Sequence, residues 1–236
     1  MKRIVQFCLP LFLVASVAVN ASSSHDLDPW EKFNRATFAF NTKLDQWLLR
    51  PTAKTYQAIT PQFVHTGIRN VFNNLRVIHG VVNYSLQGDI KKAAVGAGDF
   101  LINTTVGVGG IFDVSQQMGL DTAPTSFGQT LGKWGVGSGN YLVLPVLGSS
   151  TVRDGTGLII DSSLSVLNYV QPPEDRFAGV ALNAISARAN LFKAEALITG
   201  DQYIFLRDTY LQSRGLVQEE EGEGFGDQDF EDFEDF

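Results

Sequence analysis

The stretch from Ala93 to Phe112 constrains the fold of this chain more than any other. It is as long as a helix that crosses the hydrocarbon core of a bilayer, and Asp99 is its only charge. Five glycines interrupt it: Gly96, Gly98, Gly107, Gly109 and Gly110. Each weakens a helix by roughly 1 kcal/mol relative to alanine, so a simple lipid-facing span is not expected. The pattern favours a broken helix at membrane depth or along a cavity, while a buried core helix followed by a glycine turn stays open.

The first 21 residues predict a cleaved signal peptide and therefore export. Lys2 and Arg3 precede an apolar run, and Val19-Asn20-Ala21 is a small-residue cleavage site. An uncleaved anchor is the alternative, although the apolar run is short. The only cysteine, Cys8, comes too early for a lipidation site, so we expect a mature chain with neither a thiol nor an acyl chain.

The rest of the chain is predicted to form one domain, residues 22–214, followed by an acidic tail, residues 215–236. Ten of the 25 acidic residues lie from Glu219 onward, where no basic residue occurs, so the body is nearly neutral. Such a run is typical of a disordered extension, although docking on a basic partner surface is also open. The charge balance argues against a nucleic-acid partner.

The fold is predicted to be mainly α-helical. Asp28-Pro29-Trp30-Glu31 has the pattern of a helix start with Asp28 as N-cap, and Arg50-Pro51 is expected to end that helix. Further helix starts are predicted at Thr60-Pro61, at Gly88-Asp89 and at Asp201.

Glycines punctuate the segment from Gly119 to Gly157, which predicts a long irregular connector with at most one short strand, near residues 141–145. The helical pattern returns at Arg153-Asp154. An alanine-rich helix is then predicted from Phe177 to Ile198, ending at Gly200.

An aromatic ridge follows the first predicted helix at spacings of three and four residues. We use this name for Trp30, Phe33, Phe40 and Trp47, which share one helical face with Thr37 and Leu44. A ridge of this kind packs in a core in most proteins. Because tryptophan and phenylalanine are also favoured where a membrane meets water, a membrane-interface role is the second interpretation.

Catalytic and metal-binding motifs are not found, and no cofactor is expected. The serine in Gly137-Ser138-Gly139 lacks the G-x-S-x-G spacing, and Gly128 to Lys133 lacks the hydroxyl residue that a P-loop places after its lysine. Four carboxylates are candidates for an acid/base pair, although capping and structural roles suit them better: Asp99, Asp113, Asp154 and Asp161. The chain is therefore not expected to be an enzyme.

Four motifs, in order along residues 27 to 212, resemble the MlaA (VacJ) family. They are Asp28 to Arg35 (DPWEKFNR), Asn83 to Asp89 (NYSLQGD), Phe100 to Asp113, and Phe127 to Asp154. The chain departs from the family pattern in lacking a lipobox cysteine and in carrying Asn140 and Ser149 where proline is common. Its acidic tail has no counterpart in the resemblance.

The resemblance implies a single helical ring- or disc-like domain with a central amphipathic channel, on the periplasmic side of the outer membrane. Such proteins remove mislocalised phospholipid from the outer leaflet and pass it to a soluble periplasmic carrier, which is MlaC-like, often beside a trimeric porin. We expect one set of residues to form the wall and hinge of the lipid path: Asp99, Asn103, Thr104, Gly107, Gly109 and Gly110. The aromatic ridge is assigned to the membrane interface. A structural envelope adaptor and a periplasmic lipid or envelope hydrolase are the alternatives.

Overall fold

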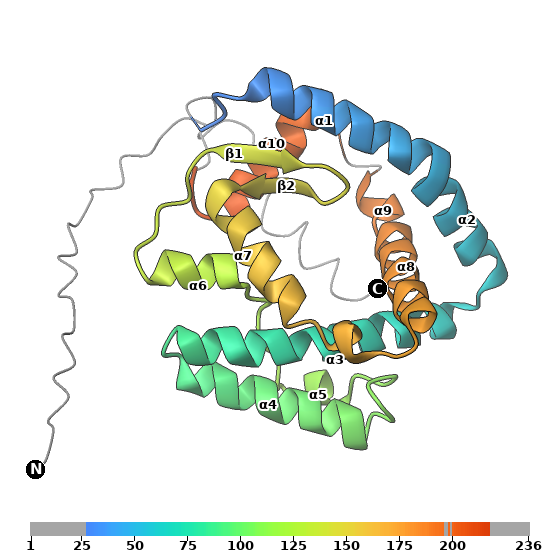
Figure 1. Cartoon of the computed structure of the whole chain (residues 1–236). Coiled ribbons are helices and arrows are strands. Elements are labelled where there is room, and N and C mark those ends of the chain that lie inside the picture. Colours follow the sequence, from blue (N-terminus) through green and yellow to red (C-terminus); the bar gives the residue numbers. More distant parts are fainter. Residues whose placement is uncertain (1–26, 196–197, 199, 218–236) are drawn as a thin grey trace, which may run out of the picture.

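Helices dominate the computed structural model, as the sequence predicts (Figure 1). The structure describes residues 27–195, 198 and 200–217. The expected signal peptide, Cys8 and the tail beyond Val217 lie outside these residues. In order, the elements are α1 Glu31–Leu44, the π-helical turn η1 Asp45–Leu49, α2 Arg50–Ile59, α3 Gln62–Leu86, α4 Ile90–Thr105, α5 Val114–Gln117, α6 Phe127–Lys133, β1 Tyr141–Leu144, β2 Gly148–Thr151, α7 Val152–Ser163, the 3-10 helix η2 Val166–Tyr169, α8 Pro173–Asn190, α9 Phe192–Glu195 and α10 Gln202–Ser213.

The first helix does not end at Arg50-Pro51, so that prediction is wrong. α1, η1 and α2 form one continuous curved rod along an edge of the molecule (Figure 1). Proline has no N–H, and its ring clashes with the carbonyl four residues earlier in a regular α-helix. Here the backbone widens just before Pro51, where the N–H of Arg50 bonds to the carbonyl of Asp45, five residues back. The π-helical turn therefore lets the helix pass through the proline.

The opposite edge consists of α3 and α4, which lie side by side and antiparallel (Figure 1). Pro61 precedes α3, and the side chain of Asp89 caps α4 by accepting a hydrogen bond from the N–H of Lys92 at 3.1 Å. Both helix starts lie where the sequence predicts them. A short link, Gln87 to Asp89, closes this helical hairpin, as is usual for antiparallel neighbours.

The glycine-rich connector is more regular than predicted, because it contains α6 and two strands. α6 begins with a capping box in which Ser126 and Gln129 bond to each other's backbone N–H groups, a local signal that the glycines obscure. β1 and β2 pair as an antiparallel hairpin with Tyr141 opposite Thr151 and Leu144 opposite Gly148. The prediction of only one strand is therefore wrong.

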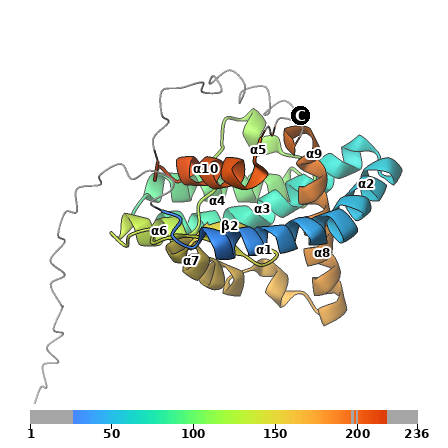
Figure 2. The ribbon, with the colours of Figure 1, turned by 90° about the horizontal axis from the view of Figure 1, so that it is seen from above.

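The hairpin forms the centre of a small apolar core. Tyr141 and Val143 of β1 are buried with Tyr203 and Leu211 of α10. β1 packs against α1 and β2 packs against α10, and α10 runs beside α1 when the molecule is seen from above (Figure 2). The hairpin therefore joins the N-terminal rod to the C-terminal helix.

The alanine-rich helix is shorter than predicted and starts earlier. α8 begins at Pro173 and ends at Asn190, where the N–H of Leu191 bonds to the carbonyl of Arg188, three residues back. This tightened turn separates α8 from α9. The last helix, α10, starts as predicted, because the side chain of Asp201 accepts a hydrogen bond from the N–H of Tyr203 at 2.9 Å.

Candidate functional site: an apolar exterior on a polar frame

The aromatic ridge of the N-terminal rod points away from the rest of the protein. Trp30, Phe33 and Phe40 are exposed, and Trp47 keeps 84% of its surface accessible. Leu48 and Ile59 are two further exposed apolar side chains of the rod. The interpretation of the ridge as a core face is therefore wrong for this helix, since all four rings are exposed among the described residues.

The inward face of α1 is polar. Oδ1 of Asn34 accepts a hydrogen bond from the N–H of Val143 at 2.9 Å, and its Nδ2 donates to the carbonyl of Tyr141 at 3.1 Å. Two turns later, Asn41 repeats this arrangement with the N–H of Val146 and the carbonyl of Leu144, at 2.7 and 2.9 Å. The two asparagine amides take the place of a neighbouring strand along β1 and the turn after it, and so satisfy backbone groups that a strand edge leaves unpaired.

α1 is thus apolar outside and hydrogen-bonded inside, the reverse of a helix on a water-soluble protein. Water-soluble proteins rarely expose contiguous apolar surface of this kind, and such surfaces mark sites that contact a membrane or a partner. The buried hydrogen bonds matter more in such a setting, because an apolar surrounding cannot replace a lost backbone partner.

The stretch from Ala93 to Phe112 folds as most of α4 followed by a turn. None of the described helices is both long and apolar enough to cross a bilayer. Asp99 and Asn103 are buried, whereas Leu101 is exposed on another face of α4. Like α1, this helix turns polar groups inward.

Asn103 holds the turn after α4. Its Oδ1 accepts hydrogen bonds from the N–H groups of Val114 and Ser115 at 2.8 and 3.0 Å. Its Nδ2 lies 2.8 Å from Oδ1 of Asp99 and 3.0 Å from Oδ1 of Asp113 and donates to both. The hydroxyl of Ser115 donates a further short bond of 2.5 Å to Asp99. One buried amide therefore ties α4 to the start of α5.

Asp99 holds its proton more tightly than an ordinary aspartate. Burial is the largest cause of its raised pKa, and the negative charges of Asp113 and Asp121 raise it further. The hydrogen bond from Ser115 acts in the opposite direction, because it stabilises the ionised form.

We call the hydrogen bonds around Asn103 the Asn103 knot. Beyond it, residues 106–112 form an apolar tip. Val106, Val108, Ile111 and Phe112 are all exposed there. Val108 adopts a left-handed backbone conformation, with φ of 55°, which is rare for a β-branched residue and strained. None of the described residues covers this strained valine side chain, which stays 60% exposed.

α3 supports the tip from below. Asn74 donates to the hydroxyl of Thr104 at 3.0 Å, and Asn70 donates to the carbonyl of Ile111 at 3.0 Å. A Cβ atom on Gly110 would lie 2.8 Å from Cβ of Asn74, so this position needs glycine. Gly107 is tighter still, because its Cβ would lie within 2.5 Å of two backbone oxygens, those of Asn103 and Phe112. Gly109 is different, since it has open space and a left-handed φ of 72°.

The six residues predicted for the lipid path therefore lie together at one end of the α3–α4 pair. Asp99 and Asn103 are in its buried knot, Thr104 contacts α3, and Gly107, Gly109 and Gly110 shape the tip. The aromatic ridge lies on the other edge of the molecule, along α1 and η1 (Figure 1). The structure does not bring the two predicted sets into contact.

The four candidate carboxylates separate into two places. Asp99 and Asp113 meet on Asn103, and Asp154 and Asp161 line one cavity beside the hairpin. Among the residues that the structure describes, no group of three or more histidines, cysteines or carboxylates is placed to hold a metal ion.

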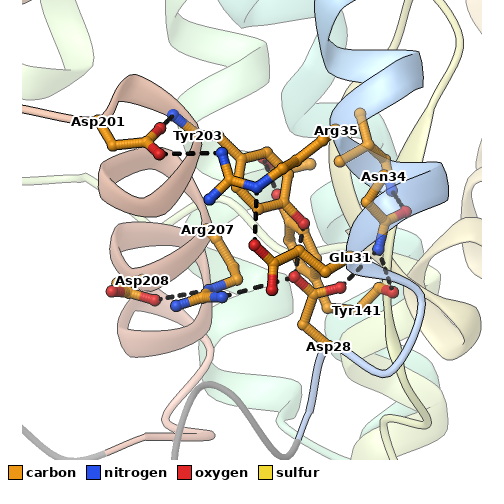
Figure 3. A network of polar contacts seen from close by, with 11 residues as sticks. Asp28, Glu31, Asn34, Arg35, Tyr141, Asp201, Tyr203, Arg207 and Asp208 are labelled. Carbon is orange, nitrogen blue, oxygen red and sulfur yellow. Dashed lines mark hydrogen bonds and ion pairs between the residues drawn. The ribbon is translucent and has the colours of Figure 1, made fainter.

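A second buried network, which no sequence pattern predicts, lies at the N-terminus of α1 (Figure 3). Asp28 was expected to cap this helix, but Trp30 occupies the N-cap position and makes no side-chain cap. Asp28 instead accepts hydrogen bonds from Asn34 at 2.8 Å and from the hydroxyl of Tyr203 at 2.5 Å, and it lies 3.5 Å from Arg207. No local signal points to this role, because two of the three partners belong to α10.

The environment of Tyr203 is strongly perturbed. Burial is the first cause that raises the pKa of its hydroxyl, and the hydrogen bond to Asp28 is the second. The guanidinium of Arg35 lies 4.4 Å from the centre of the Tyr203 ring and bonds to Asp201 at 2.9 Å (Figure 3). α1 and α10 are thus joined by a buried network and by an exposed ion pair.

Comparison with known proteins assigns the family. The sequence model described as "MlaA lipoprotein" matches residues 26–216, which includes every described helix and both strands. The chain belongs to the MlaA lipoprotein family. Cys8 and the acidic tail beyond residue 216 lie outside the match.

Relatives of this MlaA family member occur in several bacteria. The Escherichia coli K12 protein named "Intermembrane phospholipid transport system lipoprotein MlaA" is 36% identical over 196 residues, covering 80% of this chain and 78% of the relative. A Rickettsia bellii protein of unassigned function is 37% identical over 191 residues, covering 79% and 75%. A solved chain from work on the "Structural basis for maintenance of bacterial outer membrane lipid asymmetry" superposes with a TM-score of 0.68 at 35% identity, covering 79% of this chain and 96% of the other.

Proposed function

We propose that this protein moves phospholipid at the outer membrane and so maintains lipid asymmetry between its leaflets. The observation that carries the proposal is the reversed amphipathicity of α1, with an exposed aromatic ridge outside and asparagine-to-backbone hydrogen bonds inside. This distribution fits a protein embedded in an apolar surrounding, and the relatives named for phospholipid transport support the same role.

A conduit of this kind needs an apolar path more than it needs catalytic groups. Exposing the roughly 30 methylenes of a two-chain phospholipid to water costs about 0.8 kcal/mol each, or about 24 kcal/mol. A path lined by protein removes most of that cost. The chain therefore acts as a transporter component and not as an enzyme, and partner proteins supply any net direction of transport.

Within this proposal, the helices surround a central amphipathic channel, and the knot at Asn103 and the glycine tip form part of its wall and hinge. The ridge of α1 and η1 sits at the membrane interface on the periplasmic side of the outer membrane. A soluble periplasmic carrier of the MlaC type receives the lipid, and a trimeric porin stands beside the protein. Support for the hinge comes from Gly109, which has a left-handed backbone and no neighbour within 4 Å of an added Cβ.

Lipid analysis of the purified protein tests the proposal. The full chain is extracted from membranes in mild detergent, repurified in fresh detergent, and its bound lipid is measured by mass spectrometry. We expect phospholipid in stoichiometric amount, and an unrelated membrane protein purified in parallel controls for carry-over. A lipid-free protein that still binds envelope partners would support the adaptor hypothesis, and hydrolysis products in place of intact phospholipid would support a hydrolase.

A further inference from the structure

A cavity of about 150 Å³ lies between the β1–β2 hairpin, α7 and the end of α10. Engineered protein cavities of this volume bind a ligand as large as benzene, so the space is large enough for a small polar group. Three leucines line it, Leu144, Leu147 and Leu158, together with serine hydroxyls and charged groups. Leu147 and Leu158 are exposed to the outside, so apolar side chains surround its opening.

Arg214 supplies a cation with unused hydrogen-bond donors. Its Nε lies 3.0 Å from Oδ2 of Asp154, but the N–H is not aligned for a hydrogen bond. Its terminal nitrogens have no well-aligned hydrogen-bond acceptor among the described residues, although the guanidinium lies beside Tyr210, with its central carbon 5.3 Å from the centre of that ring. A guanidinium with free, forked donors is suited to a phosphate oxygen.

Asp161 supplies an anion that lacks a cation. Its Oδ1 accepts from Nδ2 of Asn83 at 3.1 Å, and its Oδ2 accepts from the N–H of Phe127 at 2.8 Å. Both donors are neutral, and within the described residues Asp161 takes part in no ion pair. These two bonds fix the carboxylate on the cavity wall and leave lone pairs on both oxygens, since a carboxylate can accept about four hydrogen bonds.

The charged side chains around the cavity do not form two separate ion pairs. Asp154 is already satisfied, because Arg153 lies 3.2 Å from its Oδ1 and the hydroxyl of Tyr210 donates to its Oδ2 at 2.7 Å. The two arginines and two aspartates sum to zero charge, but the free donors belong to Arg214 and the uncompensated charge belongs to Asp161. A ligand that carries both a negative and a positive group suits this arrangement.

We propose that this cavity binds the zwitterionic head group of a phosphoethanolamine lipid, with the phosphate on Arg214 and the ammonium on Asp161. This inference rests on the proposed function, since it presumes that phospholipid is the cargo. Acyl chains leave past Leu147 and Leu158, because the cavity is too small to contain them. A phosphoglycerol head group has no ammonium to offset Asp161 and binds less well.

Competition between two lipids tests the inference. The full chain in detergent is loaded from micelles with equal amounts of phosphatidylethanolamine and phosphatidylglycerol, repurified, and its bound lipids are quantified by mass spectrometry. We expect the parent to favour phosphatidylethanolamine. Asp161→Asn should lower that preference roughly fivefold, which corresponds to an ion pair of about 1 kcal/mol at a half-exposed site.

Arg214 gives an independent variant. Arg214→Gln should reduce binding of both lipids, because each carries a phosphate, and Arg214→Lys should restore part of it. Asp175→Asn, on the exposed start of α8, is the matched control for loss of one carboxylate and should bind like the parent. Thermal unfolding of every variant shows which remain folded. Should Asp161→Asn unfold, Leu158→Trp fills the cavity without changing charge and should lower binding of both lipids.

The outcomes separate this inference from the proposed function. If the parent carries no phospholipid, the transport proposal fails and the head-group site fails with it. If the parent carries lipid but folded Asp161→Asn keeps the parent's lipid ratio, only the head-group site is wrong. A last arm adds free phosphoethanolamine, which should compete with lipid; binding of the free compound without displacement of lipid would place the lipid elsewhere and overturn the inference.

Discussion

The hydroxyl of Tyr203 donates a 2.5 Å hydrogen bond to Asp28, a fully buried carboxylate 175 residues earlier in the chain. This bond links the two ends of the described chain, because it joins the loop before α1 to the final described helix (Figure 3). Neighbouring Arg207 brings the only formal positive charge within 4 Å of this carboxylate among the described residues. Removal of one partner from such a buried group costs more than its bond alone, since the other partners stay desolvated.

Tyr203→Phe should therefore destabilise the protein while leaving its fold intact. We expect a loss of about 2 kcal/mol in the free energy of unfolding, which lowers the Tm by about 4 to 8 °C for a chain of this size. Thermal unfolding in detergent, followed by circular dichroism, measures it. Tyr169→Phe is the control, because Tyr169 is exposed and should be insensitive. Equal Tm values for both variants would show that the Asp28 network contributes no net stability.

The sequence predicts the elements whose signals are local. Asp89 and Asp201 cap α4 and α10 as expected, because an N-cap bonds to the backbone only two or three residues away. The same reasoning fails at Asp28, whose pattern fits an N-cap but whose strongest partner is on α10. Local rules cannot detect a competing partner that folding brings from a distant part of the chain.

Periodicity identifies a helical face but not what covers it. Phe33, Phe40 and Trp47 share one face as predicted, yet the same spacing suits a protein core and a membrane interface. The signal that decides lies on the other face, where Asn34 and Asn41 recur seven residues apart. The two asparagines take the place of a strand beside the hairpin. Since the hairpin lies a hundred residues later in the chain, only the three-dimensional structure reveals this role.

Asp99 should make stability depend on pH in a direction opposite to that of an ion-paired aspartate. Its pKa is raised in the folded state, so between the ordinary aspartate value and the raised value the folded protein binds more protons than the unfolded chain. Its contribution to stability is thus fully present below the unfolded pKa and is lost as pH rises through the folded pKa. At neutral pH the ionised carboxylate costs stability.

Asp99→Asn should remove this cost, because its Oδ1 can still accept the bonds from Asn103 and Ser115. The measurement is the Tm of parent and variant from pH 7 down to pH 4. We expect the variant to be at least as stable as the parent at pH 7, and its relative advantage to shrink as the pH falls. A difference between the two that stays constant with pH would mean that Asp99 titrates normally.

Two of the three glycines at the apolar tip, Gly109 and Gly110, should respond differently to alanine. Gly109→Ala should cost about 1 to 2 kcal/mol, because its Cβ meets no neighbour and only the left-handed backbone is strained. Gly110→Ala should cost more, since its Cβ also meets Asn74 at 2.8 Å. Gly80→Ala, in α3 with open space, is the control and should be neutral or slightly stabilising.

Thermal unfolding ranks these three variants, and growth in detergent with a chelator reports on the outer membrane. We expect cells with Gly109→Ala to become sensitive while the protein keeps normal abundance, because the hinge loses freedom. Parent-like resistance at normal abundance would leave Gly109 as an ordinary turn residue and remove the hinge from the proposal.

The aromatic ridge should anchor the protein to a membrane without contributing to its fold. Replacing Phe33, Phe40 and Trp47 together by serine removes three exposed rings, each of which gains about 1.5 to 3 kcal/mol if fully buried in an apolar phase. Flotation with phospholipid vesicles should show more than a tenfold loss of membrane association, while the Tm in detergent changes little. The triple variant Lys32→Ser, Ala39→Ser and Gln46→Ser places serines one residue earlier, at exposed positions of the same rod, and should float like the parent. If both triple variants float equally well, another surface holds the protein on the membrane; a large fall in Tm for the aromatic variant alone would return the ridge to a structural role.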